Sequence, residues 1–293
     1  MCPYHPCFSI NQKSASIFDY YRRYTAQQEH RRSSHGCWEN RRKILIGGKK
    51  MVDMIVTDLT RFNNREHLCM AGLALDDNRC IRPLLPYNGG APGYLTYAEC
   101  QEKDILPGTI LRVNYRPPRH LVAPHLEDVI LTGDVEVVDV ATSAQFHEAL
   151  RASSVTTLRE GFGVALPNGQ KFIPSDLALP RSICTLRLRP QNFEVVADGY
   201  NPTRIRAHVT DANGQTFRFL SITDLGFYDY VGNPVTRRLT VQEAMTGIRQ
   251  QRELFLRIGL SRHHHAQDGR AGYWLQVNGI YTFPDYNVVL RQY

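Results

Sequence analysis

Short stretches of alternating apolar and polar residues, separated by turn residues, dominate the chain after its first fifty residues. The clearest is 203–224, where Ile205 and Ala207 alternate with polar residues ahead of the turn Asn213-Gly214. Alternation with a period of two predicts strands with one buried face, and Asn-Gly is typical of a hairpin turn. The sequence therefore predicts a mainly β fold. Its predicted strands and hairpins are 54–62, 68–75, 80–87, 105–116, 129–140, 183–190, 193–198, 203–224, 253–262 and 273–285.

Two segments carry helical signals instead. Segment 143–153 has apolar residues on one face and Ser143 as a suitable cap, and 240–251 begins with Thr240 and has Glu243 at the capping-box position. Each half of the chain thus contains about five strands with one helix inserted, as a five-stranded OB-type barrel does. Counting strands does not distinguish OB barrels from other small barrels.

The fold class that we predict is mainly β with a few inserted helices, as two OB-like small β-barrels in tandem. The predicted parts are a basic extension at 1–50, a first barrel at 51–160, an irregular linker at 161–180 and a second barrel at 181–293. Residues 1–50 show no steady period of a helix or strand. We expect them to be disordered, or to reflect a gene start placed too early, with the true start at Met51 or Met54.

The net charge of +7 is unevenly distributed. Residues 1–50 hold 10 Lys and Arg against 3 Asp and Glu, which leaves 25 basic and 25 acidic residues in 51–293. A basic arm of this kind is typical of segments that touch nucleic acid. The rest of the chain is neutral, so a phosphate-binding surface there has to come from the arrangement of its basic residues. Of these, 23 are arginines, which suit bidentate phosphate contacts but which a GC-rich genome also produces.

Several classes of protein are disfavoured by what the sequence lacks. No stretch approaches about 18 apolar residues, and no signal-peptide pattern opens the chain. The 7 cysteines are scattered without a CxxC pair, so we expect a reducing, cytoplasmic location. Walker A, GxGxxG, GxSxG and HExxH motifs do not occur, which argues against the enzymes that use them. We expect no cofactor and no metal, and interpret His263-His264-His265 as a solvent loop.

Five motifs carry a resemblance to a known family. They are TDLTR at 57–61, CIRP at 80–83, APHLED at 123–128, RIGLSR at 257–262 and YWLQVNGIYTFPDY at 273–286. Together they resemble the prokaryotic dual OB-containing domain family, whose members are described as associated with nucleic-acid or nucleotide modification. The resemblance covers most of 54–286 and none of 1–50. It implies two OB barrels and a role connected with nucleic acid.

Arginines on predicted strand faces are the first candidates for nucleic-acid contact. Arg187 and Arg189 share one strand face, while Arg204 and Arg206 share another with His208. If these faces adjoin, they form a positive surface, on which OB barrels bind oligonucleotides with help from aromatic rings. The available rings are Phe217, Phe219, Tyr228 and Tyr230. The alternative is an ordinary solvated face with the rings in the core.

The two C-terminal motifs supply further candidates. Arg257 and Arg262 flank the GLS of the first motif. In the second motif Trp274, Gln276 and Asn278 alternate onto one strand face, with Tyr281 nearby, which suits stacking on and hydrogen bonding to a base. Alternatively, Asn278-Gly279 is a turn and Trp274 is a core or edge residue.

An acid–base cluster is the candidate for catalysis. His125, Glu127 and Asp128 lie close in sequence after a proline, and such a set can transfer protons or hold a metal. The alternative is a hydrogen-bonded loop. Asp58 and Arg61 are expected to form a structural ion pair at the end of the first strand, or Asp58 is a carboxylate in a cleft.

These observations favour a nucleic-acid-binding accessory protein, associated with nucleic-acid modification or a prokaryotic defence system. The expected partners are single-stranded or modified nucleic acid and a protein of that modification system, with no membrane. An enzyme acting on a nucleotide or base through His125, Glu127 and Asp128 is the first alternative. A protein–protein adaptor that uses the barrels as scaffolds is the second.

Overall fold

The computed structural model describes residues 50–62, 66–88, 91–166, 169–199, 201 and 204–285. The predictions for residues 1–49 lie outside these ranges. Within them, no helix has both the length and the apolar character needed to cross a membrane. The cysteines described are free thiols at positions Cys69, Cys80, Cys100 and Cys184.

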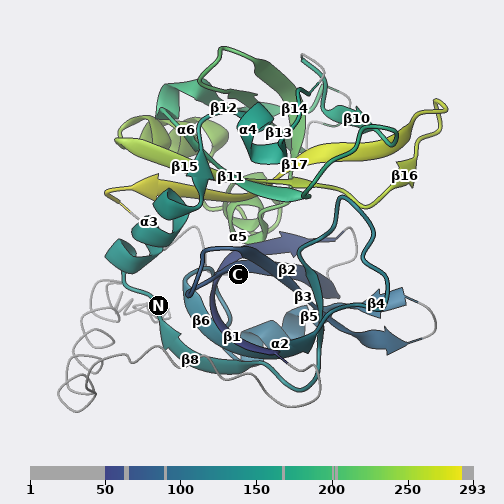
Figure 1. Cartoon of the computed structure of the whole chain (residues 1–293). Coiled ribbons are helices and arrows are strands. Elements are labelled where there is room, and N and C mark those ends of the chain that lie inside the picture. The colour runs from purple at the N-terminus through teal and green to yellow at the C-terminus, as the bar shows by residue number, and fades with distance from the viewer. Residues whose placement is uncertain are drawn as a thin grey trace, which may run out of the picture. The chain divides into compact units, whose positions relative to one another are not determined.

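Five strands of the first sheet close into a barrel with the strand order of an OB fold (Figure 1). Antiparallel pairing joins β1 to β2 and β2 to β3, β3 runs parallel to β7, and β6 joins β7 back to β1. A register shift between Val56 and Asp58 lets β1 bend, so that its first half pairs with β6 and its second half with β2. The strands are β1 (Lys50–Arg61), β2 (His67–Ala74), β3 (Cys80–Asn88), β6 (Thr109–Arg116) and β7 (Asp128–Leu131).

Smaller elements complete this first barrel. Helix α2 (Tyr97–Glu102) stands between β3 and β6 in the chain, and its capping box of Thr96 and Glu99 explains where it begins. The predicted strand or hairpin at 129–140 forms β7 and a separate strand, and both pair with β6 rather than with each other. The remaining strands are β4 (Ala91–Gly93), β5 (Leu95–Thr96) and β8 (Glu136–Val140).

The second sheet repeats the pairing order of the first and is called the second barrel below. Here the 3-10 helix η1 (Pro190–Asn192) divides the first strand in two, so that β11 pairs with β15 while β12 pairs with β13. Strand β14 pairs with β13 and runs parallel to β17, which pairs with β15. The strands are β11 (Ile183–Leu188), β12 (Phe193–Ala197), β13 (Ile205–Thr210), β14 (Thr216–Ile222), β15 (Glu253–Leu260) and β17 (Ala271–Phe283).

Short elements surround the second barrel. Strand β9 (Ser154–Val155) pairs with β11, whereas β10 (Phe172–Pro174) and β16 (His264–His265) both pair with β17. Between β14 and β15 the chain forms α5 (Leu225–Phe227), the π-helix η2 (Tyr228–Gly232) and α6 (Val241–Arg249). The last elements are α3 (Ser143–Ala152) and α4 (Leu158–Phe162).

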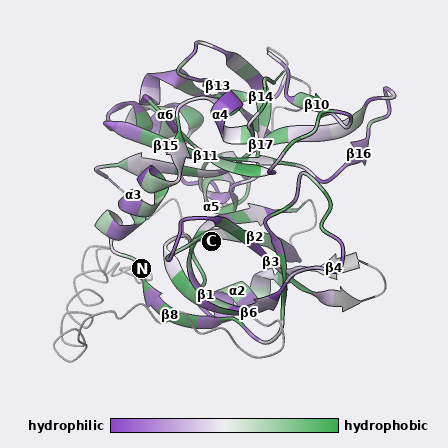
Figure 2. Cartoon of the chain, viewed as in Figure 1, coloured by the Kyte–Doolittle hydropathy of each residue, from purple (hydrophilic) through white to green (hydrophobic). Residues whose placement is uncertain are grey.

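Three apolar clusters form the core. Many strand segments are green, that is hydrophobic, in Figure 2. One cluster fills each barrel. The third joins them, because Ile55 of β1 packs with Phe255 of β15 and Tyr281 of β17, with Phe146 of α3 in the same cluster. At about 25 cal/mol per Å² of apolar surface, burial of these rings stabilises the contact between the barrels.

The mainly β fold class with inserted helices is confirmed. The hairpin prediction is confirmed as β13 and β14, with Gly214 at a φ of 78° in the turn. The helix prediction at 240–251 is confirmed as α6, with the capping box of Thr240 and Glu243 formed. The predicted cap Ser143 is wrong by one residue, because the side chain of Thr142 accepts from the backbone of Gln145 and α3 begins after it.

Candidate nucleic-acid interface

A row of polar side chains crosses three strands of the second barrel. In the strand register Arg206 of β13 lies opposite Ser221 of β14, and Ser221 lies opposite Gln276 of β17. The alternation of β13 explains this placement. Its odd-numbered residues are buried, so Arg206 points to the opposite, less buried face of the strand. The guanidinium of Arg206 donates to Asp198 Oδ2 at 2.7 Å and to Ser221 Oγ at 2.5 Å. These bonds fix its direction along the sheet.

Three further basic residues belong to the same region. Arg204 is exposed two residues before Arg206. Lys171 precedes β10, and its Nζ donates to the carbonyl of Phe219 at 3.4 Å. Burial lowers the pKa of Lys171, and the charges of Arg206 and Arg270 lower it further, while Asp198 opposes them. Positive charge is therefore concentrated here although 51–293 is neutral overall.

Aromatic rings lie beside these cations. Pairing of β10 with β17 places Phe172 opposite Trp274, with ring centroids 5.0 Å apart. The guanidinium of Arg270 lies 5.4 Å from the centroid of Phe172. The backbone of Trp274 is held by Ser261, which exchanges two hydrogen bonds with it. Cations bind phosphates and aromatic rings stack on bases, so this combination suits a nucleic-acid strand.

Strand β14 adds one more ring through an irregularity. The register with β13 shifts between Ala207 and Val209, and Phe219 adopts a φ of 57°, which turns its ring outward. Phe219 is 44% exposed, whereas Phe217 is fully buried in the core. The ring of His208 lies 4.7 Å from that of Phe219. The term basic-aromatic face is used below for this set: Lys171, Phe172, Arg204, Arg206, Phe219, Arg270 and Trp274.

Sequence reasoning named part of this face and missed part of it. It named Arg204, Arg206 and Trp274, and the structure brings them into one region with Gln276. It missed Lys171, Phe172 and Arg270, which lie in a segment read as irregular and in the loop after β15. No local pattern marks them, because the pairing of β10 with β17 joins residues about a hundred positions apart.

Arg187 and Arg189 lie elsewhere on the second barrel. Arg187 is in β11, which pairs with β15 and β9, and β11 and β13 are not paired with each other. Arg189 directly precedes η1 and is exposed. We therefore leave both outside the basic-aromatic face.

Arg257 is buried between the barrels. Its Nε donates to Asp58 Oδ2 at 2.8 Å, and its terminal nitrogens donate to Thr185 Oγ1 at 2.8 Å and to Cys80 Sγ at 3.1 Å. Burial alone would lower the pKa of Arg257, but the charges and hydrogen bonds of Asp58 and Cys80 together outweigh it and raise that pKa. The expected ion pair of Asp58 with Arg61 is wrong, since residues three apart on a strand point to opposite faces.

Tyr281 and Asn278 are also turned into the protein. The hydroxyl of Tyr281 donates to the carbonyl of Thr57 at 2.6 Å, and Asn278 Oδ1 accepts from Thr223 Oγ1 at 3.0 Å. Asn278-Gly279 is not a turn: β17 continues through it, and Asn278 is an extra residue of a bulge opposite β15. Both side chains use their polar groups internally, so the basic-aromatic face leaves them out.

The acid–base candidates hold the two barrels together. Asp128 accepts from Arg82 Nε at 2.5 Å and from Arg262 at 2.8 Å, while Glu127 accepts from the hydroxyl of Ser182. These bonds connect the first barrel to residues at the start of β11 and the end of β15. The carboxylates thus have structural partners, and Arg262 is held beside them, 41% exposed.

His125 is neutral and enclosed. Both ring nitrogens are buried and have no hydrogen-bond partner among the described residues. Burial lowers its pKa to about 2, and the charges of Arg82 and Arg262 contribute to this shift. Among the described residues, no three His, Cys, Asp or Glu side chains gather closely enough to hold a metal ion. Catalysis by His125, Glu127 and Asp128 stays a prediction.

Several solved structures align with most of the chain at low similarity. One is the HINa domain of Ifi202 in complex with 20-base-pair duplex DNA, at 9% identity and a TM-score of 0.31, with 80% of this chain and 94% of that chain covered. Another is a murine DNA-binding protein bound to duplex DNA, at 12% identity and 0.29, with 80% and 97% covered. A third is a replication protein A heterotrimer bound to single-stranded DNA, at 8% identity and a TM-score of 0.33, with 86% of this chain and 53% of that chain covered.

Among curated proteins, none matches the chain. Among protein families, the dual OB-containing domain matches residues 54–280. This match spans most of the chain, including nearly all of both barrels, four of the five motifs identified in the sequence and residues 273–280 of the fifth. The chain therefore belongs to the dual OB-containing domain family.

Proposed function

We propose that this protein binds single-stranded or modified nucleic acid through the basic-aromatic face of its second barrel. One observation carries the proposal: Lys171 and Arg270 flank the ring pair Phe172–Trp274. Arg206 lies in the same sheet on β13, and Arg204 directly precedes that strand. Rings stack on bases of any sequence, and the cations neutralise phosphates on either side.

The position of the face in the barrel supports this reading. OB barrels bind oligonucleotides on the face of their second and third strands, between the loops that follow the first and fourth strands. In the second barrel β13 and β14 are the second and third strands. The loop after the fourth strand, β15, carries Arg270, and the loop after the first carries Arg204.

The acidic partners set the expected strength. Asp198 pairs with Arg206, and Asp268 pairs with Arg270 at 2.6 Å, with both side chains of the second pair about half exposed. An exposed ion pair of this kind stabilises by about 1 kcal/mol or less, so a phosphate can replace Asp268 as the partner of Arg270. With Lys171, Arg204 and Arg270 as phosphate contacts, log affinity should fall with log salt at a slope of about 2.

We further propose that binding serves nucleic-acid modification or a prokaryotic defence system, in which the protein is an accessory to a modification-system protein. The motifs that resemble proteins associated with nucleic-acid modification support this assignment. The basic-aromatic face would present a strand, and the partner would act on it.

Fluorescence anisotropy tests the binding proposal. The full chain is titrated into labelled single-stranded and duplex DNA and RNA at two salt concentrations. The double variant Lys171→Gln, Arg270→Gln is expected to bind a single strand about tenfold more weakly and with less salt dependence. Arg187→Gln, an arginine of β11 outside the face, is the matched control. Equal affinity of the double variant and the control would overturn the proposal and move binding to the basic N-terminal arm.

A further inference from the structure

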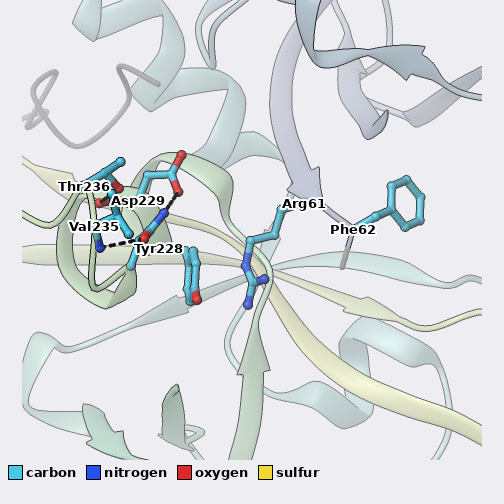
Figure 3. A pocket seen from close by; sticks show the side chains of 7 residues that line it. Arg61, Phe62, Tyr228, Asp229, Val235 and Thr236 are labelled. Carbon is cyan, nitrogen blue, oxygen red and sulfur yellow. Dashed lines mark hydrogen bonds between the residues drawn. The ribbon is translucent and has the colours of Figure 1, made fainter. Parts of the chain in front are cut away.

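A cavity of about 410 Å³ opens between the end of β1 and the segment that follows α5. Its size falls within the range of ligand pockets. Figure 3 shows Arg61 beside the ring of Tyr228 on one side of the cluster, with Asp229, Val235 and Thr236 on the other. The lining is therefore a cation on an aromatic ring next to hydrogen-bonding groups.

Backbone contacts hold the wall that carries Arg61. Its amide donates to the carbonyl of Thr223 at 2.9 Å, and Thr60 forms a bridge with Asp224. Asp224 in turn accepts from the amide of Phe227 at 3.0 Å and from that of Ile280 at 2.9 Å. The end of β1 is thus fastened to the start of α5 and to β17.

Side-chain hydrogen bonds hold the opposite wall. Asn233 donates to Asp229 Oδ1 at 3.1 Å and accepts from the amide of Val235 at 3.0 Å. Thr236 donates to the carbonyl of Asp229 at 2.8 Å. The wall begins with the π-helix η2, a conformation that is rare and frequent at functional sites. Val235 is 89% exposed at the mouth.

Arg61 gives the cavity its charge. Its guanidinium lies 3.5 Å from the centroid of the Tyr228 ring, and its Nε is buried without a hydrogen-bond partner among the described residues. A buried donor without an acceptor is costly, and a ligand with an acceptor group would remove that cost. The Arg61 amide is bonded to Thr223, two residues after Ser221, whose hydroxyl accepts from Arg206, so the cavity lies near the basic-aromatic face.

We propose that this cavity binds one unstacked nucleotide of the strand that lies on the basic-aromatic face. The proposal rests on the proposed function and extends it to a pocket for a single base. The base stacks against the Arg61–Tyr228 pair, its phosphate is neutralised by Arg61 and Arg204, and Asp229 and Thr236 face the edge of the base. Such a pocket would let the protein inspect one base at a time, as recognition of a modified base requires.

Isothermal titration of the full chain with adenosine 5′-monophosphate tests this site. We expect saturable binding at one site, at least tenfold tighter than binding of inorganic phosphate or adenosine. Arg61→Gln and Tyr228→Leu should each weaken it at least tenfold, whereas Tyr228→Phe keeps the ring and should retain the affinity. Arg151→Gln, an exposed arginine on α3, is the matched control. Because Arg61→Gln can disturb folding, Val235→Glu places a carboxylate at the open mouth and should also weaken binding.

The outcomes separate this proposal from the proposed function. If oligonucleotides bind through the basic-aromatic face but the monophosphate does not bind, the pocket proposal is wrong and the proposed function stands. If the monophosphate binds no better than phosphate, or equally well to Val235→Glu, the pocket proposal is also wrong. If Lys171→Gln with Arg270→Gln leaves oligonucleotide affinity unchanged, the proposed function fails whatever the monophosphate does.

Discussion

The two barrels share one strand order but use the same strands differently. In the first barrel the third strand contacts the second barrel, because Cys80 accepts from Arg257 and the Arg82–Asp128 pair binds Arg262. In the second barrel the third strand β14 and its neighbour β13 carry Phe219 and Arg206 away from the core. One topology therefore serves as a docking surface in the first half and as a candidate ligand surface in the second.

The difference is visible in the burial of the second strands. All seven residues of β2 after His67 are apolar or small, and most are buried, whereas β13 alternates between buried and half-buried residues. A strand covered on both faces reads as a continuous apolar run, and a strand with one open face alternates. The segment LCMAGLAL thus differs from RIRAHV for a physical reason.

Breaking the contact between the barrels should have the largest effect. Arg257→Leu leaves the Asp58 carboxylate buried without its main partner, so the free energy of unfolding should fall by about 3–5 kcal/mol. Arg262→Leu removes a half-exposed pair partner of Asp128 and should cost about 1 kcal/mol or less. Urea denaturation measures both. Equal losses would mean that the buried pair contributes no more than an exposed one.

The contact between the two barrels should also weaken in acid, because His125 is buried there in its neutral form. Its pKa is about 2 in the folded chain and 6.5 in an unfolded one, so below pH 6.5 the unfolded state binds a proton that the folded state does not. The contribution of His125 to the free energy of unfolding is therefore complete above pH 6.5 and is lost as the pH falls toward 2. The free energy of unfolding should drop by about 2 kcal/mol between pH 7 and pH 5 from this group. His125→Phe should reduce that drop, and an unchanged pH profile would contradict the assignment.

The open face of the second barrel should depend on its ring. Trp274→Ala is expected to lower affinity for single strands by about 1–3 kcal/mol, because a stacking platform is lost. The salt dependence should stay as it is, since no charge is removed. Trp274→Phe keeps a ring and should restore most of the affinity. Anisotropy at two salt concentrations separates these results, and a changed salt slope in Trp274→Ala would argue against stacking.

The smallest expected effect is found when one lysine from each barrel is replaced and the two variants are compared. Lys171 and Lys103 are the two lysines after residue 51, and Lys103 is exposed at the end of α2 in the first barrel. Lys171→Gln should lower the salt slope of single-strand binding by about 0.7, the value for one phosphate contact. Lys103→Gln should leave the slope unchanged. Equal slopes in the two variants would remove the distinction between the barrels.

Local patterns predicted what depends on local physics. The hairpin around Asn213-Gly214, the capping box at Thr240 and the outward direction of Arg206 follow from turn chemistry, capping and alternation. Arg257 shows where such patterns stop. Alternation predicts the face on which a side chain lies, but the partner that covers that face is Asp58, 199 residues away in the chain. Lys171 and Phe172 were missed for the same reason.

Strand β17 connects the two uses of the fold through a single extra residue. Its first half presents Trp274 on the basic-aromatic face, and its second half sends Tyr281 to the carbonyl of Thr57. The bulge at Asn278 offsets the two halves, so each keeps its own orientation on one continuous strand. Insertions or deletions on either side of the bulge would therefore have separate consequences. A lineage could change its candidate ligand surface on one side while it preserves the joint between its barrels on the other.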